Sequence, residues 1–146
     1  MNKELVAKQS VKLNATPSDV WNVLTDPEEI KKYFFGTKVT SDWKVGGSIV
    51  FSGEWEGHEY IDKGTILELI PERKLVYDYW SSVGGTPDAP ENYGLITYLL
   101  TPDNEGTLLE ISQQGFENEE KRDHSVEGWK SVLKNMKEVL YSRTVA

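Results

Sequence analysis

The spacing of apolar residues changes along the chain, and the changes predict the order of its elements. Residues 4–13 alternate loosely, with Val11 and Leu13 two positions apart, which is typical of a strand. Near the other end, apolar residues recur every three or four positions, which predicts a long helix from about Arg122 to about Ser142. Its single apolar stripe consists of Val126, Trp129, Val132, Leu133, Met136, Val139 and Leu140.

Two short helices are predicted directly after the first strand. Thr16 is a favourable N-cap and Pro17 suits the first helical position. Asp26-Pro27 repeats this signal, because proline is tolerated in the first turn of a helix but not in its interior. We therefore expect one helix to end there and a second to run from about Pro27 to Tyr33.

The middle of the chain reads as strands separated by turn residues. The predicted strands cover residues 49–55, 60–70, 74–81, 93–100 and 107–114. The last two are expected to form a hairpin, and the Gly- and Pro-rich segment 82–92 is expected to be a mobile loop. The order of these elements predicts an α+β domain in which an antiparallel sheet carries its helices on one side. That order is a strand, two short helices, a meander of strands and a long helix.

Composition and charge narrow the classes of function. The chain has 146 residues, no cysteine and a formal net charge of −8. Disulfides and thiol chemistry are excluded, and without a basic cluster we expect no nucleic-acid partner. No apolar run approaches the roughly 18 residues of a membrane span, and the N-terminus lacks the apolar core of a signal peptide. We expect a single domain over residues 1–146, a monomer, and a cytoplasmic location.

Candidate catalytic and metal-binding residues are sparse. His58 shares a strand face with Asp62, so one interpretation is a two-ligand metal site or a weak acid–base pair. We favour surface solvation of both side chains, because no third ligand follows at a suitable spacing. His124 falls in the first turn of the last helix and is expected to be exposed. The sequence predicts no catalytic residue, no metal and no cofactor, and hence not an enzyme.

Aromatic residues on inward strand faces are the main candidates for a binding site. Tyr77 and Tyr79 share a face, which we expect to point inward, and Trp80 falls on the opposite face near the rim. Gln113 is an inward polar candidate, with a solvated strand end as the alternative. The predicted ligand-binding residues are Phe51, Trp55, Tyr77, Tyr79, Tyr98, Gln113, Phe116, Trp129, Leu133 and Met136. The alternative for each apolar member is that it simply fills a core.

Several short motifs occur in an informative order. They are Ala15–Trp21, Leu24–Glu28, Gly46-Gly47, Gly64–Leu75, Gly106–Ile111, Gly115-Phe116 and Glu127–Trp129. Together, from about Lys8 to Leu140, they resemble the START-like superfamily and, within it, the family named for the C-terminal domain of the activator of heat-shock-protein-90 ATPase. The resemblance implies a helix-grip fold, in which a curved antiparallel sheet of about six or seven strands wraps around the long C-terminal helix.

The resemblance leaves several functions open, because one fold serves many. Relatives include binders of lipids, hormones and polyketides, some aromatases and cyclases, and the chaperone activator itself. We favour a carrier or sensor that encloses a small hydrophobic molecule (lipid-like, aromatic or polyketide-like) between sheet and helix, with segments 82–92 and 34–36 at the entrance. The alternatives are a stress-response co-chaperone that binds a chaperone through its outer surface, and an aromatase- or cyclase-like enzyme. The eukaryotic activator has a further N-terminal domain that contributes to chaperone binding, and the resemblance does not extend to it.

Overall fold

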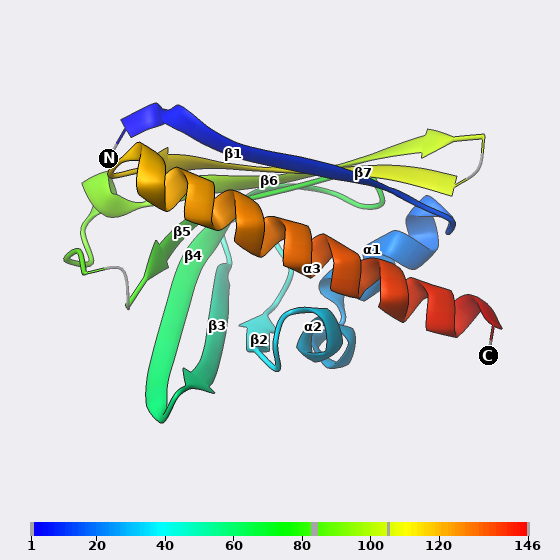
Figure 1. The fold of residues 1–146 in the computed structure, drawn as a ribbon, viewed down its shortest axis with the longest axis horizontal. Coiled ribbons are helices and arrows are strands. Elements are labelled where there is room, and N and C mark those ends of the chain that lie inside the picture. The colour runs from blue at the N-terminus through cyan, green and yellow to red at the C-terminus, as the bar shows by residue number, and fades with distance from the viewer. Residues whose placement is uncertain (1, 83–84, 105, 146) are drawn as a thin grey trace.

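A seven-stranded antiparallel sheet curves around one long helix (Figure 1). The computed structural model describes residues 2–82, 85–104 and 106–145. The strands are β1 (Asn2–Leu13), β2 (Lys38–Ser41), β3 (Ser48–Trp55), β4 (His58–Ile70), β5 (Lys74–Ser81), β6 (Gly94–Asp103) and β7 (Gly106–Phe116). The helices are α1 (Pro17–Thr25), α2 (Pro27–Tyr33) and α3 (Glu119–Val145). The predicted α+β class and helix-grip architecture are confirmed.

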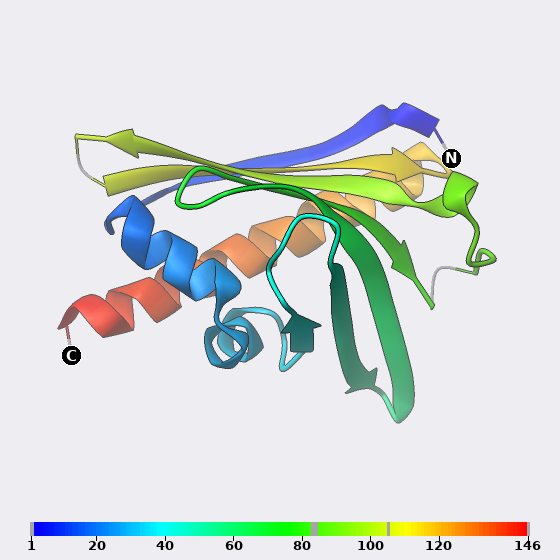
Figure 2. The same cartoon turned by 180° about the vertical axis from the view of Figure 1, so that it is seen from behind.

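The strand order, β1-β7-β6-β5-β4-β3-β2, is a meander to which the N-terminal strand is added beside the last one. The register between β4 and β5 shifts between Ile66 and Glu68, which marks a β-bulge. A bulge bends its strand and increases the local twist. Figures 1 and 2 show β3 and β4 turning away from the plane of β1, β6 and β7, so that α3 lies inside the bend.

The boundaries of the two short helices agree with their capping signals. The Thr16 side chain accepts a hydrogen bond from the backbone N–H of Asp19 at 3.2 Å, and Pro17 begins α1. The Asp26 carboxylate accepts from the N–H of Glu28 at 2.9 Å and caps α2. Each cap satisfies a backbone donor that the first helical turn leaves unpaired. The prediction of two helices, with the second at Pro27–Tyr33, is confirmed.

Some element boundaries differ from the prediction. Helix α3 begins at Glu119 rather than near Arg122, since the Asn118 side chain accepts from the N–H of Lys121 at 2.9 Å, in the manner of an N-cap. Strand β2 was not predicted, because four residues are too few to show a period. In the predicted loop 82–92, residues Pro90–Asn92 form a 3₁₀ turn, and residues 83–84 lie outside the described part.

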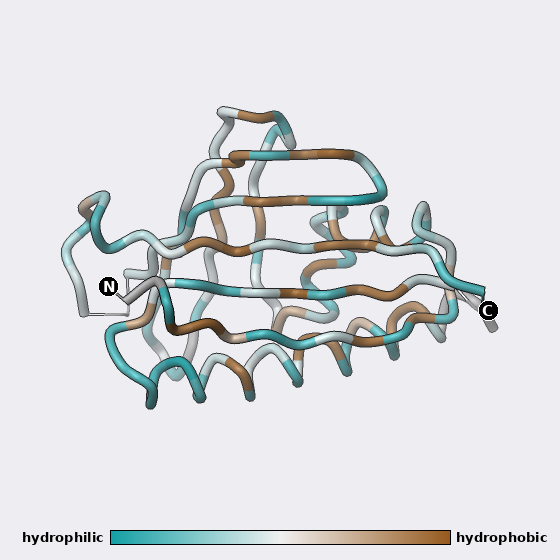
Figure 3. The backbone as a smooth tube through the Cα atoms, turned by 90° about the horizontal axis from the view of Figure 1, so that it is seen from above, coloured by the Kyte–Doolittle hydropathy of each residue, from teal (hydrophilic) through white to brown (hydrophobic). Residues whose placement is uncertain are grey.

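The core lies between the concave face of the sheet and α3. Figure 3 shows apolar positions interspersed with polar ones along the strands. Because successive side chains of a strand point to opposite faces, one face of the sheet packs on this core. The buried set includes Leu109 and Ile111 from β7 and Leu133, Met136 and Leu140 from α3. None of the described helices combines the length and the apolar character that crossing a membrane requires.

Candidate ligand-binding cavity

A cavity of about 390 Å³ lies between the concave face of the sheet and the N-terminal half of α3. This volume falls within the range of small-molecule sites, roughly 300–1,000 Å³. Its walls come from the segment after α2, from five strands and from α3. The lining residues are Phe34, Phe35, Phe51, Asp62, Tyr77, Tyr79, Ile96, Gln113, His124, Ser125, Glu127, Gly128, Trp129, Ser131 and Val132.

Aromatic side chains form a closed cluster at the inner end of the cavity. The cluster consists of Phe34, Phe51, Tyr77, Tyr98 and Trp129. Each ring contacts the next, with centroid separations from 5.8 Å (Phe51 to Tyr77) to 6.1 Å (Phe34 to Trp129), and the last contact returns to the first. Phe34 and Phe51 are stacked and the other pairs are tilted or edge-to-face, and both arrangements stabilise aromatic pairs beyond the area that they bury.

This aromatic cluster separates the cavity from the deeper core. Phe34, Phe51, Tyr77 and Trp129 line the cavity, whereas Tyr98 lies on the far side, at a small void of about 10 Å³. The Tyr77 and Tyr98 hydroxyls are hydrogen-bonded at 3.1 Å. Burial raises the pKa of Tyr77 well above its ordinary value and that of Tyr98 to about 12, so both hydroxyls stay protonated at neutral pH.

Gln113 carries a fixed polar group in the cavity wall. Its Oε1 accepts from the Trp129 indole N–H and from the Ser125 hydroxyl, each at 2.9 Å. The orientation of the amide is settled by chemistry, because an indole nitrogen can only donate. Both lone-pair positions of the oxygen are used, which leaves the amide NH₂ as the group available to a ligand. Gln113 is part of strand β7 rather than a solvated strand end.

Asp62 places a carboxylate in the same wall. The Tyr79 hydroxyl donates to Asp62 Oδ2 at 2.6 Å, while Oδ1 is buried and accepts from no donor among the described residues. Burial raises the pKa of the Asp62 carboxyl above its usual range, and the nearby hydroxyls of Ser81 and Tyr79 oppose that shift in part. Carboxylates displaced in this way inside a cavity are candidate functional groups.

The entrance of the cavity combines an exposed ring with a helical glycine. Phe35 is 59% exposed and has φ +56°, in the left-handed region, so the chain turns after α2 with Phe34 directed inward and Phe35 at the rim. Gly128 lies on the same face of α3 as Ser125 and Val132, and a Cβ there would have no neighbour within 4 Å. Packing therefore does not require glycine at this position. Its effect is to keep the flank of the helix open.

The structure brings half of the predicted ligand-binding residues together. Phe51, Tyr77, Tyr79, Gln113 and Trp129 line the cavity, and their role in binding stays a prediction. Leu133 and Met136 are buried in the core, as is Tyr98, while Phe116 lines a second, smaller cavity of about 120 Å³. The side chain of Trp55 lies outside the described part of the structure.

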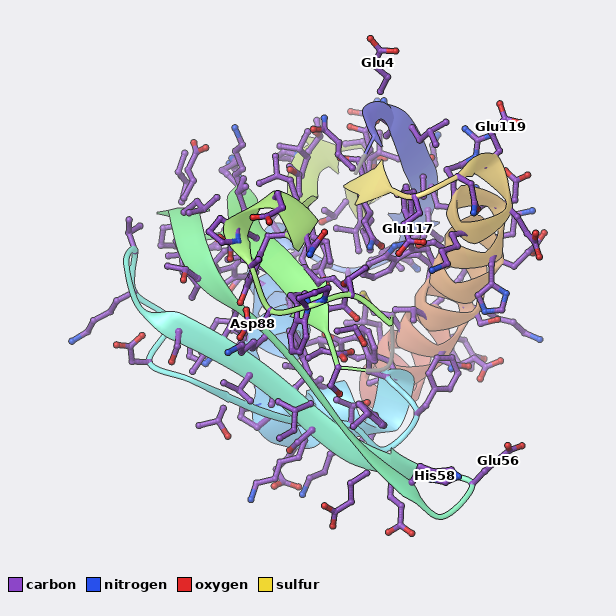
Figure 4. The ribbon with its side chains drawn as sticks, turned by 90° about the vertical axis from the view of Figure 1, so that its left-hand side faces the viewer. Glu4, Glu56, His58, Asp88, Glu117 and Glu119 are labelled. Carbon is purple, nitrogen blue, oxygen red and sulfur yellow. The ribbon has the colours of Figure 1, made fainter. Side chains whose placement is uncertain are left out.

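Three polar residues at the cavity were not predicted to bind a ligand. His124 is exposed, as expected, but lies at the cavity rim. Ser125 precedes Trp129 by one helical turn, and this spacing could have indicated that the two share a face. Asp62 was considered only with His58, which sits exposed beside Glu56 at the tip of the β3–β4 hairpin (Figure 4). The two positions are about 13 Å apart along β4, so they form no pair.

The described residues also contain no cluster of three or more His, Asp or Glu side chains that could hold a metal ion. What the site offers is an apolar, aromatic cavity with a few polar groups in its wall. This combination suits the enclosure of a small molecule.

Comparisons with known proteins place the chain in a family. The sequence model described as "Activator of Hsp90 ATPase homolog 1-like protein" matches residues 14–141. The solution structure of ChR145 from Cytophaga hutchinsonii is 41% identical, with 100% of each chain covered and a TM-score of 0.84. No match was found among curated proteins.

More distant structures share the fold. MLL2253 from Mesorhizobium loti is 22% identical, with 94% of this chain and 97% of that chain covered and a TM-score of 0.77. DynU16, a protein of the dynemicin biosynthetic locus, is 17% identical, with 93% of this chain and 47% of that chain covered and a TM-score of 0.78. The chain therefore belongs to the family of activator of Hsp90 ATPase homolog 1-like proteins, as its motifs indicated, and has the START-like, helix-grip fold.

Proposed function

We propose that the protein binds a small hydrophobic ligand between the sheet and α3, as a carrier or sensor. The observation that carries this proposal is the cavity of about 390 Å³, with its apolar, mainly aromatic wall and its opening beside Phe35 and Gly128. A surface-interaction module such as a co-chaperone needs only a packed core. The hollow interior therefore supports ligand binding over that alternative.

Gly128 is a position at which the proposal can be tested. A Cβ there would meet no atom within 4 Å, so a side chain can be added without disturbing the packing of α3. Glycine inside a helix costs about 0.5–1 kcal/mol relative to alanine, so alanine at this position should stabilise the helix.

The size of the cavity sets a scale for affinity. Burial of ~300 Å² of apolar ligand surface at ~25 cal/mol per Å² contributes about 7 kcal/mol before the cost of association. Affinity is then micromolar at best, unless polar contacts add to it.

The test uses a neutral fluorescent probe and a pair of variants at one position. N-phenyl-1-naphthylamine becomes more fluorescent in apolar surroundings, and we expect a saturable rise with the native protein. Gly128→Ala, the matched control, should bind equally and unfold at a slightly higher temperature. Gly128→Phe should fold but lose most of the signal, because its ring occupies the cavity side of α3.

Two results would contradict the proposal. One is the absence of a saturable signal with the native protein. The other is an equal signal with a folded Gly128→Phe variant, which would place the probe elsewhere.

A further inference from the structure

The charges around the cavity constrain the ligand. Among the described residues that line it there is no lysine or arginine, and the carboxylates there belong to Asp62 and Glu127. Lys63 follows Asp62 directly in β4, so its side chain points to the opposite face of the sheet. There it lies 5.7 Å from the centre of the Trp80 ring and pairs with Asp88. The net charge of −8 adds to the negative field.

An anionic ligand is therefore disfavoured in this cavity. A carboxylate or phosphate group that leaves water needs a cation or several donors to replace its hydration. The wall holds the Asp62 carboxylate and the Gln113 amide NH₂, while His124 and Ser131 line the cavity from exposed positions on α3, where water still hydrates them. Fatty acids and phospholipids do not match this wall.

A neutral hydroxyl does match it. Asp62 lines the cavity, and its Oδ2 accepts one described hydrogen bond, from Tyr79, whereas a carboxylate oxygen has two lone pairs with which to accept. A neutral hydroxyl can donate a hydrogen bond to the Asp62 carboxylate, which an ionised carboxylate ligand cannot do. The surrounding flat rings favour a ligand that is itself a ring.

We infer that the ligand is a neutral ring compound with a hydroxyl group that donates to Asp62, and that the cavity rejects organic anions. This inference rests on the proposed function. It makes Asp62 the residue that determines specificity among ligands of similar shape.

Three naphthalenes that differ in one substituent test the inference, by NMR titration or calorimetry at pH 7. 2-Naphthol should bind about tenfold more tightly than 2-methylnaphthalene, because a hydrogen bond to a charged acceptor is worth about that factor or more. 2-Naphthoate should bind at least about tenfold more weakly than 2-naphthol, since its charge faces Asp62 without a counter-ion.

Variants assign the selectivity to one carboxylate. Asp62→Asn should reduce the preference for naphthol several-fold and strengthen the binding of naphthoate. Glu28→Gln is the matched control, because its carboxylate is 77% exposed, is paired with Lys31 on α2 and does not line the cavity. It removes the same charge and should leave the naphthol-to-methylnaphthalene ratio unchanged.

The outcomes distinguish this inference from the proposed function. Equal binding of naphthol and methylnaphthalene, or naphthoate binding as tightly as naphthol, overturns the inference, whereas saturable binding of the neutral probe still supports the cavity as a site. Binding of none of the naphthalenes overturns the inference, and if the probe of the preceding section also fails to bind, the proposed function falls with it.

Discussion

The two halves of α3 lie against the same sheet but have different surroundings. The C-terminal half presents Leu133, Met136 and Leu140, all within the buried core. The N-terminal half presents the small residues Ser125, Gly128 and Ser131 to the cavity. Small side chains on one stretch of a helix leave space that large ones on the next stretch fill. Residue size along α3 therefore contributes to the cavity.

The aromatic cluster lies at the boundary between these halves. Trp129 contacts Phe34 and Tyr98 edge-on and donates its indole N–H to Gln113. It therefore links the helix to both the cavity wall and the core. Substitutions in the C-terminal half should therefore lower stability, whereas substitutions in the N-terminal half should weaken ligand binding.

The largest effect should come from removing the Trp129 side chain, which lies between the two halves. Trp129 is 6% exposed, and Trp129→Ala should lower the free energy of unfolding by about 3–5 kcal/mol. It should also abolish binding of the fluorescent probe, because the cavity loses its inner wall. Denaturant unfolding followed by circular dichroism measures the first effect.

Trp129→Phe keeps an aromatic ring at the boundary but removes the indole N–H that donates to Gln113 and part of the ring volume. It should cost less than Trp129→Ala and retain probe binding. If Trp129→Ala lowered the free energy of unfolding by less than about 1 kcal/mol, the indole ring would stabilise neither half of α3, and its assignment as the boundary would be wrong.

A substitution in the packed half should separate stability from binding. Met136 is 1% exposed, and Met136→Ala should cost about 2–5 kcal/mol through the void that it leaves. Under conditions where the variant is folded, its affinity for the probe should equal that of the native protein. Lys134→Ala, at an exposed position of the same helix, is the control and should change stability by less than about 0.5 kcal/mol. Weaker probe binding by Met136→Ala would mean that the two halves are not independent.

Local signals in the sequence predicted much of this fold. Thr16-Pro17 and Asp26-Pro27 carry their capping groups within a few residues, so both helices could be placed correctly. The two-residue period along β5 likewise placed Tyr77 and Tyr79 on the cavity side. These predictions depend only on neighbours in the chain.

The division between hollow and packed regions could not be predicted in the same way. Tyr79 and Tyr98 both have inward parity, yet Tyr79 lines the cavity and Tyr98 fills the core. Whether an inward residue meets a hollow or a packed region depends on the residues that lie opposite it, and these are distant in the sequence. Asp62 illustrates the same limit, since the rest of its cavity wall comes from other strands and from α3.

The smallest expected effect concerns the carboxyl group of Asp62, which lines the cavity opposite the N-terminal half of α3. Because burial raises the pKa of Asp62, the folded state binds this proton more tightly than the unfolded state does. The contribution of this group to stability is therefore complete below the ordinary pKa of 3.8 and is lost as the pH rises through the raised pKa.

Asp62→Asn cannot ionise and can still accept from the Tyr79 hydroxyl, so it should be more stable than the native protein at pH 7, with the difference vanishing near pH 3. Tyr79→Phe should steepen the loss, because it removes a hydrogen bond that favours the ionised form. Urea unfolding of the native protein and both variants between pH 3 and pH 8 measures these free energies of unfolding. If the difference in free energy between Asp62→Asn and the native protein did not vary with pH, Asp62 would be as well solvated in the cavity as in the unfolded chain.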